Sequence, residues 1–159
     1  MKSKHLFLTQ LLCSFLGIAN ASAQQTNEQQ WLNEAKIAIS NSNAIYFKAF
    51  VSGDSSVFID RYAEDCCIMA PNLPALCQKN AAGEFFRMAY TQVGIRNGRF
   101  TTTELFGNGK DFVTESGLFE LYDGNNNIID TGKYLVLWKK TANGWKMFRD
   151  SFSSNNPIR

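Results

Sequence analysis

Hydrophobic residues recur at helical spacing through the first part of the chain. From about residue 28 to residue 51 they stand three and four positions apart, which predicts one long amphipathic helix. Its expected buried face consists of Leu32, Ala35, Ile39, Ser42, Tyr46, Ala49 and Phe50. Gly53 is expected to end this helix, and Asp54 to cap a short second one. The second helix would hold Val57, Phe58, Arg61 and Tyr62.

A third stripe of apolar residues predicts another amphipathic helix over residues 80–93. Gly94 is expected to end it, because glycine readily adopts the backbone conformation that closes a helix. Between the second and third helices, residues 66–70 and 75–78 have the pattern of a short hairpin, with a turn at residues 71–74.

The pattern then becomes typical of strands. The predicted strands are residues 99–107, 111–122, 128–141 and 144–154, all rich in Thr, Val, Phe, Tyr and Trp. Strong turn signals separate them, namely Asn108-Gly109, residues 123–127 and residues 142–144. Three helices followed by an antiparallel meander describe an α+β fold, with the helices on one face of the sheet. Residues 24–159 are predicted to form a single domain.

The first 23 residues have the layout of a secretory signal peptide. A short basic stretch precedes an apolar run from Leu6 to Ile18, and Ala21-Ser22-Ala23 offers a cleavage site before Gln24. An apolar run of about 13 residues is too short to cross a bilayer. We therefore expect export to the periplasm or the extracellular space, with no membrane anchor after cleavage.

Cleavage would change the charge and the available chemistry. Removing residues 1–23 takes away Lys2, Lys4 and His5, which leaves fourteen basic and fourteen acidic residues and no histidine. A neutral chain with no basic stripe argues against a nucleic-acid partner. Nucleophile systems that depend on histidine cannot be built without an imidazole, and the common zinc sites need either histidine or four cysteines, of which only three would remain. We expect no metal and no cofactor, so acid–base chemistry would fall to Asp, Glu, Tyr, Lys or Cys.

Three cysteines remain after cleavage, and an oxidising compartment would allow two of them to pair. Cys66 and Cys67 would point to opposite faces of a strand. A hairpin around residues 71–74 places Cys67 roughly opposite Cys77, which favours that disulfide. Three reduced, buried thiols are an equally open alternative.

Several segments together resemble one family. In the helical part they are residues 46–54 (YFKAFVSGD) and residues 62–65 (YAED), the latter followed by Ala70-Pro71. In the predicted strands they are the alternation Glu115, Gly117, Phe119, the run from Asp130 through Gly132, Lys133 and Tyr134 to Trp138, and Gly144-Trp145-Lys146. Asp150 and Ser154-Asn155 extend the match. In this order they resemble the nuclear transport factor 2-like superfamily, and in particular its ketosteroid-isomerase-related SnoaL-like or DUF4440 proteins. The resemblance covers nearly all of residues 30–156.

The resemblance implies a cone in which a curved sheet wraps around the long helix and encloses a largely apolar pocket. Relatives include isomerases, cyclases, dehydratases and proteins with no known reaction, often as dimers, so the fold alone does not decide the function. Ketosteroid isomerases place a tyrosine eight residues before the Gly-Asp aspartate, and Tyr46 has that spacing from Asp54. Their general base corresponds here to Ala70, which cannot take a proton, and their second oxyanion donor lies nearest to Tyr134.

Two carboxylates are candidate catalytic groups in their own right. Strand alternation places Asp150 on one face with Phe148 and Phe152 unless a bulge intervenes, and aromatic neighbours would raise its pKa. Glu115 shares a face with Val113, Gly117 and Phe119, and Gly117 there would permit a kink or leave room for a ligand. The simpler interpretations are a structural partner for Asp150, and cross-strand pairing of Glu115 with Lys133, Lys146 or Arg149.

Tyr46 is the third candidate, either as a hydrogen-bond donor to a ligand or as a core residue bonded to a carboxylate such as Asp150. The expected pocket lining is Tyr62, Met69, Phe86, Tyr90, Phe119, Tyr134 and Trp138. The first hypothesis is a domain that binds a small apolar molecule. The second is an isomerase, cyclase or dehydratase that uses Tyr46, Glu115 and Asp150, and the third is an interaction module that forms a homodimer through its sheet.

Overall fold

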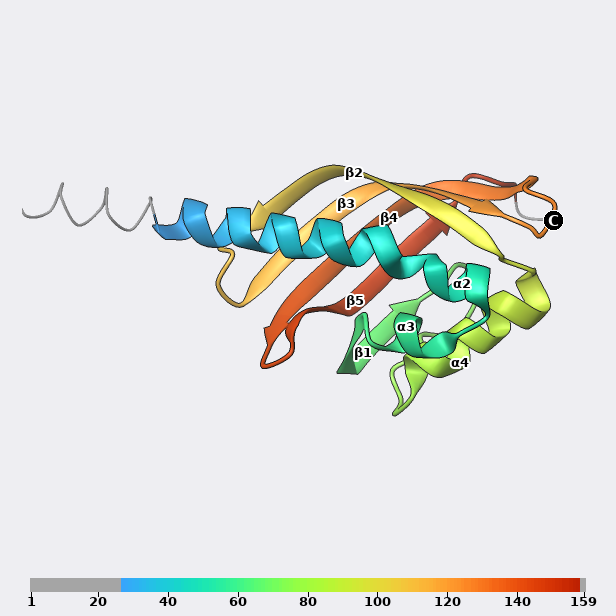
Figure 1. Cartoon of the computed structure of the whole chain (residues 1–159), viewed down its shortest axis with the longest axis horizontal. Coiled ribbons are helices and arrows are strands. Elements are labelled where there is room, and N and C mark those ends of the chain that lie inside the picture. Colours follow the sequence, from blue (N-terminus) through green and yellow to red (C-terminus); the bar gives the residue numbers. More distant parts are fainter. Residues whose placement is uncertain (1–26, 158–159) are drawn as a thin grey trace, which may run out of the picture.

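The long N-terminal helix opens the part of the chain that the computed structural model describes, residues 27–157. It runs over residues 27–46, breaks at Phe47 and continues as α2 (Lys48–Ser52) (Figure 1). The predicted face is buried from Ala35 onward, with Leu32 partly buried, and Gly53 closes α2 in the left-handed conformation. The predicted signal peptide lies outside the described residues. Within them, no helix is long and apolar enough to cross a membrane.

Two further helices follow the predicted pattern. Asp54 caps α3 (Ser55–Ile59) by accepting a hydrogen bond of 2.9 Å from the backbone N–H of Ser56. The third predicted helix is divided into α4 (Ala81–Met88) and a π-helical turn, η1 (Ala89–Val93). Gly94 ends this turn in the left-handed conformation, as expected.

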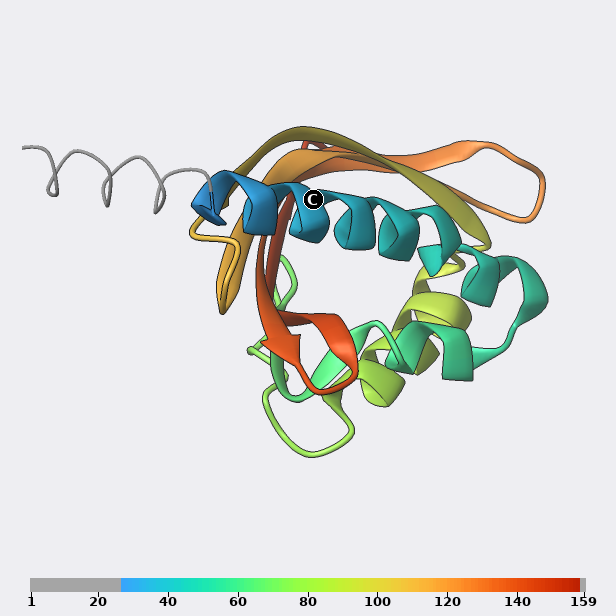
Figure 2. The same ribbon diagram turned by 60° about the vertical axis from the view of Figure 1, so that its left-hand side comes forward.

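The sheet contains β1 (Tyr62–Met69), β2 (Asn97–Gly107), β3 (Phe112–Tyr122), β4 (Ile128–Thr141) and β5 (Gly144–Ser154). Its spatial order is β1-β5-β4-β3-β2, with β1 parallel to β5 and the other pairs antiparallel. Figure 2 shows the sheet curving so that its concave side faces the helices. The predicted α+β architecture is confirmed.

The predicted hairpin between residues 66–70 and 75–78 is wrong in extent. β1 starts at Tyr62, which the sequence pattern assigned to the second helix, and its main partner is β5. Only a single bridge, Ile68 with Leu76, joins β1 to the following loop. Pro71 and Pro74 lack a backbone N–H and therefore limit a longer ladder in that loop.

The cysteines of β1 differ in state. Cys67 forms a disulfide with Cys77, the pairing that the hairpin argument favoured, and it ties β1 to the loop before α4. Cys66 is a free, buried thiol.

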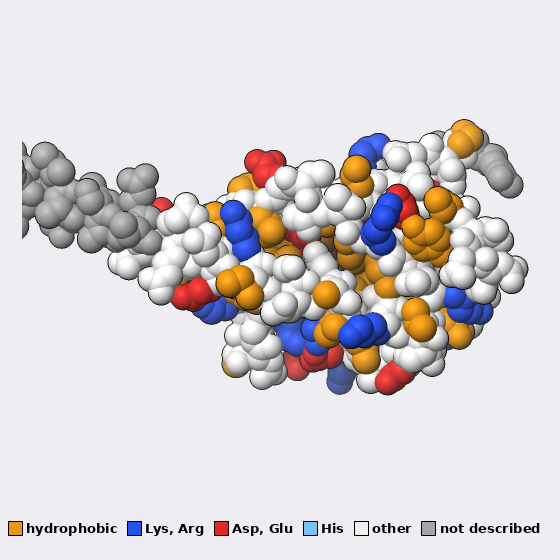
Figure 3. Space-filling model, turned by 45° about the horizontal axis from the view of Figure 1, so that its top comes forward, with side chains coloured by type: hydrophobic (Ala, Val, Ile, Leu, Met, Phe, Trp, Pro, Cys, Tyr) orange, Lys and Arg blue, Asp and Glu red, His pale blue; other side chains and the backbone are white. Residues whose placement is uncertain are grey.

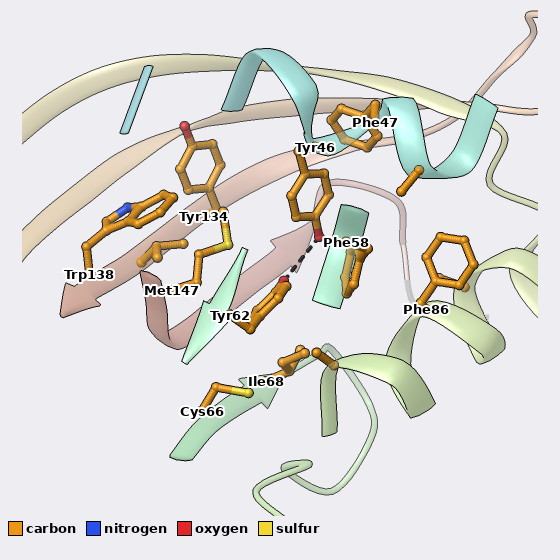
Figure 4. Packing of buried hydrophobic residues seen from close by; sticks show 14 of the residues in the cluster. Tyr46, Phe47, Phe58, Tyr62, Cys66, Ile68, Phe86, Tyr134, Trp138 and Met147 are labelled. Atoms are coloured by element: carbon orange, nitrogen blue, oxygen red, sulfur yellow. Dashed lines mark hydrogen bonds between the residues drawn. The ribbon is translucent and has the colours of Figure 1, made fainter. Parts of the chain in front are cut away.

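The core lies between the concave face and the helices, whereas the convex face is partly apolar and exposed. Inside, the rings of Tyr46, Phe50 and Phe58 contact one another. Figure 4 shows Tyr46 and Phe58 side by side in this core. Outside, Leu118 of β3 and Leu135 of β4 are each 51% exposed. This convex face is the surface through which the sequence predicts dimerisation.

Candidate functional site

Two buried carboxylates lie in one row across the concave face of the sheet. Glu115 of β3 is paired with Val136 of β4, and Val136 is in turn paired with Asp150 of β5. Glu115 is fully buried and Asp150 is 7% exposed. Strands are spaced about 4.8 Å apart, so Val136 separates the backbones of the two acids by roughly 10 Å. The sheet therefore brings together the two acids that the sequence singled out.

Asp150 points inward because β5 contains a bulge. Met147 is paired with Trp138 and Arg149 with Leu137, so Phe148 is one residue in excess. An extra residue reverses the alternation of side chains beyond it. The expectation that Phe148 flanks Asp150 is therefore wrong. Phe148 instead packs against Phe112, with the guanidinium of Arg149 over its ring. Phe152, beyond the bulge, does share the inner face with Asp150.

Glu115 is surrounded by four hydrogen-bond donors from three elements, the long helix, β2 and β4. Its Oε1 accepts bonds from the Asn43 amide (2.7 Å), the Thr102 hydroxyl (2.6 Å) and the Tyr134 hydroxyl (2.8 Å). Its Oε2 accepts a bond of 2.9 Å from the Trp138 indole. All four donors are neutral, so the expected pairing of Glu115 with Lys133, Lys146 or Arg149 is wrong. Those cations lie on the outer face or at the sheet edge. There Lys133 contacts Asn155, Lys146 contacts Asp60 and Arg149 contacts Phe148.

The glycine next to Glu115 on the same face makes room for one of these donors. A Cβ at Gly117 would overlap the phenol of Tyr134, which lies directly opposite on β4. The sequence suggested that Gly117 permits a kink or leaves space for a ligand. In the structure, the Tyr134 ring occupies that space and reaches across the strand to Glu115.

Asp150 ends a short chain of hydrogen bonds through two buried tyrosines. Tyr62 donates to Oδ2 of Asp150 at 2.7 Å, and the hydroxyls of Tyr62 and Tyr46 are 3.1 Å apart (Figure 4). Because the Tyr62 proton is directed to Asp150, Tyr46 is the donor to Tyr62. Both phenolic protons are thus engaged within the protein. Burial, together with the nearby charge of Asp150, raises the pKa of Tyr46 and of Tyr62.

The environment of Asp150 favours its protonated form. Burial raises the pKa of this carboxyl from 3.8 to about 6, the hydrogen bond from Tyr62 opposes the shift, and the charge of Glu115 adds to it. Within residues 27–157, neither Asp150 nor Glu115 forms an ion pair with a lysine or an arginine. A buried carboxyl that titrates near neutral pH is the kind of group that acid–base chemistry uses.

Both acids and Tyr46 line a cavity of about 60 Å³ between the long helix and the sheet, called here the inner cavity. Most of its lining is apolar, and the full set is Asn43, Tyr46, Phe47, Phe50, Phe85, Ile95, Phe100, Glu115, Phe119, Leu121, Tyr134, Val136, Met147, Asp150 and Phe152. The structure therefore brings the three candidate catalytic residues to one small space.

Of the side chains predicted to line a pocket, Phe119 and Tyr134 border the inner cavity, whereas five others do not. Tyr62 and Trp138 lie behind the carboxylates to which they donate. Phe86 and Tyr90 stack on each other along α4 and η1, and Met69 is at the end of β1.

Sequence reasoning missed several residues of the inner cavity. Asn43 and Phe47 are on the long helix, outside the stripe used to define its face, and Phe100 lies in a strand of mixed polarity. Asn43 stands four residues after Ile39 and three before Tyr46 of the predicted face, and this helical spacing is a signal that could have indicated it. Within residues 27–157, no three acidic or cysteine side chains gather in a way that could hold a metal ion.

No protein-family model and no curated protein matches this sequence significantly. Solved structures do match in fold. A ketosteroid isomerase-like protein from Erwinia carotovora atroseptica SCRI1043 has 21% identity and a TM-score of 0.63, over 79% of this chain and 99% of that one. An NTF-2 like protein of unknown function from Shewanella oneidensis MR-1 has 16% identity and a TM-score of 0.60, over 74% and 98%.

A third similar structure is that of an enzyme. The LinA-type3 hexachlorocyclohexane dehydrochlorinase from Novosphingobium barchaimii LL02 has 10% identity and a TM-score of 0.61, over 80% of this chain and 91% of that one. The chain has the fold of the nuclear transport factor 2-like superfamily, as the sequence resemblance implied. At these identities the likeness extends to the fold alone, and the function has to be argued from the site.

Proposed function

We propose that the protein binds a small, largely apolar molecule in the inner cavity. The observation that carries this proposal is the lining, in which aromatic and aliphatic side chains surround the space and two buried carboxylates reach into it. Apolar walls with a few placed polar groups are typical of small-molecule sites. Oδ2 of Asp150 accepts a bond from Tyr62, and Oδ1 has no partner within residues 27–157, so Oδ1 is left for a donor on the ligand.

The size of the inner cavity limits what it holds at rest. Its volume of about 60 Å³ is well below the roughly 150 Å³ of an engineered apolar cavity that binds benzene. A single aromatic ring therefore needs a neighbouring side chain to move, and Phe100 is positioned to do so because it lies at the margin of the cavity. Its ring contacts those of Phe47 and Tyr134, with centroids 4.8 Å and 5.1 Å away.

Filling the inner cavity should abolish binding. The probe is benzyl alcohol, which combines one ring with a hydroxyl that can donate to Asp150. We expect wild-type protein to bind it, and Val136→Phe to bind at least about ten-fold more weakly, because the larger side chain occupies the space between the two acids. Ligand-detected NMR titration measures both affinities, and circular dichroism verifies that the variant is folded.

Leu135→Phe is the matched control for this experiment. Like Val136→Phe, it replaces an aliphatic side chain of β4 by phenylalanine, but on the convex face, where Leu135 is exposed. It should bind benzyl alcohol as wild type does. Equal binding by wild type and Val136→Phe would show that the ligand binds elsewhere and would refute the proposed function.

A second candidate function is proton transfer on a bound carbon acid, as in an isomerase or a dehydratase. It is favoured by Asp150, whose pKa of about 6 suits a general base near neutral pH and which faces the inner cavity. In this reaction Asp150 takes a proton from a carbon next to a carbonyl group and returns it to the same or a neighbouring carbon. Tyr62 holds the carboxylate in position.

Proton transfer can be tested without knowledge of the natural substrate. Wild-type protein should accelerate deuterium exchange into cyclohexanone in D₂O, with a rate that rises as pH increases through about 6. Asp150→Asn should slow this catalysed exchange by at least about a hundred-fold, because the amide cannot accept the proton. Exchange by Asp150→Asn at the wild-type rate would exclude this role for Asp150.

A further inference from the structure

A second and larger hollow, called here the outer groove, lies beside the inner cavity. It runs between the long helix with α2 on one side and the first half of β2 on the other, and its volume is about 430 Å³. This volume falls in the range of sites that hold small molecules. Figure 3 shows hydrophobic and basic side chains side by side around a hollow on the face formed by the long helix and β2.

The outer groove and the inner cavity share part of their walls. Asn43, Phe47 and Phe100 line both spaces. The Phe47 ring fits against β2 only because residue 98 is a glycine, since a Cβ there would overlap it. Because the Phe100 side chain lines both spaces, its rotation would join them. A molecule in the inner cavity can therefore extend into the outer groove.

The two spaces differ in charge. The charged residues that line the inner cavity are Glu115 and Asp150, whereas those that line the outer groove are Lys48 and Arg99. Arg99 forms an ion pair of 2.7 Å with Glu120, and Lys48 has no ion pair within residues 27–157. An anionic group would be repelled by the acids inside and attracted by the cations outside.

A buried polar atom between the two spaces lacks a partner. Asn43 donates from Nδ2 to Glu115, and its Oδ1 is buried with no hydrogen-bond partner in the described part of the chain. An unpaired acceptor at this depth costs about 1–3 kcal/mol. A hydroxyl or N–H group on a ligand that passes Asn43 would satisfy it.

We infer that the ligand is an amphipathic anion, with its apolar ring in the inner cavity and a carboxylate-like group in the outer groove at Lys48 and Arg99. The inference rests on the proposed function and adds to it the class of ligand and the direction in which it lies. The charges fix this direction, because the reverse orientation would bring the anion to Glu115 and Asp150.

The test compares two probes that differ only in charge, phenylbutanoate and phenylbutanamide. Isothermal titration calorimetry at low salt measures their affinities for wild type, Lys48→Gln and Lys79→Gln. Lys79 is an exposed lysine before α4 that lines neither space, so it is the matched control. We expect wild type and Lys79→Gln to bind the acid about five-fold more tightly than the amide, and Lys48→Gln to lose this preference.

The outcomes separate the orientation from the proposed function. Equal affinities for acid and amide, or an unchanged preference in Lys48→Gln, would overturn the inferred class of ligand while binding in the inner cavity still stands. If Val136→Phe binds both probes as wild type does, or if neither probe binds wild type, the proposed function fails as well. Loss of the preference in Lys48→Gln, with unchanged affinity for the amide, supports both.

Discussion

Replacing Glu115 by alanine should reduce the free energy of unfolding by about 3–5 kcal/mol, the largest loss that we expect from a single substitution in this protein. Glu115 is fully buried and accepts the bonds of Asn43, Thr102, Tyr134 and Trp138. Alanine would leave all four donors, of which Tyr134 and Trp138 are buried, without this acceptor, and it would leave a void beside Val136. Urea unfolding, followed by tryptophan fluorescence, measures the change.

Two further variants show whether the loss comes from the hydrogen bonds. Glu115→Gln keeps the size and one acceptor oxygen but turns an amide group toward the Trp138 indole, so we expect a smaller loss of about 1–3 kcal/mol. Glu104→Ala removes an exposed carboxylate from β2 and should change stability by no more than about 0.5 kcal/mol. If Glu115→Ala were as stable as Glu104→Ala, the network around Glu115 would have no structural importance.

The stability of the folded protein should carry a pH dependence that comes from Asp150. Its pKa rises from 3.8 to about 6 on folding, mainly because the carboxyl is buried. Between these values the folded state binds more protons than the unfolded state, so the contribution of Asp150 to stability falls as pH increases. Each pKa unit corresponds to about 1.36 kcal/mol, so Asp150 contributes about 3 kcal/mol at low pH. This contribution is lost once pH exceeds about 6.

Asp150→Asn isolates this effect from the other acids. Four other aspartates have lowered pKa values and contribute the opposite slope in both proteins, namely Asp54, Asp60, Asp65 and Asp123. The difference in unfolding free energy, variant minus wild type, should therefore increase by about 2.4 kcal/mol from about pH 4 to about pH 7. A difference that stays constant over this range would show that folding does not raise the pKa of the Asp150 carboxyl.

Most of the fold could be predicted from the sequence because local signals mark its elements. Residues 128–141 and 144–154 were predicted as strands with the bounds of β4 and β5, since an Asn-Gly turn separates them. The start of β1 was not, because its main partner is β5, far along the chain, and no local pattern reports such a parallel pairing.

The candidate site was predictable only in its acids. Alternation along β3 correctly placed Glu115 on the inner face, because this strand has a regular pleat at that point. Its four donors come from the long helix, β2 and β4, so their convergence depends on tertiary packing. The sequence favoured cations as partners for Glu115, since a charge usually needs one, whereas the fold supplies neutral donors.

The bulge at Phe148 has a consequence for tracing the ancestry of this site. A gapless alignment with a relative whose β5 has regular alternation would match Asp150 to an outward-facing position of that relative. The residue equivalent to Asp150 in space would then be missed, although both proteins could hold a carboxylate at the same point. Comparisons with distant homologues should therefore be made by superposition, or with a one-residue gap at Phe148, before the acid is described as gained or lost.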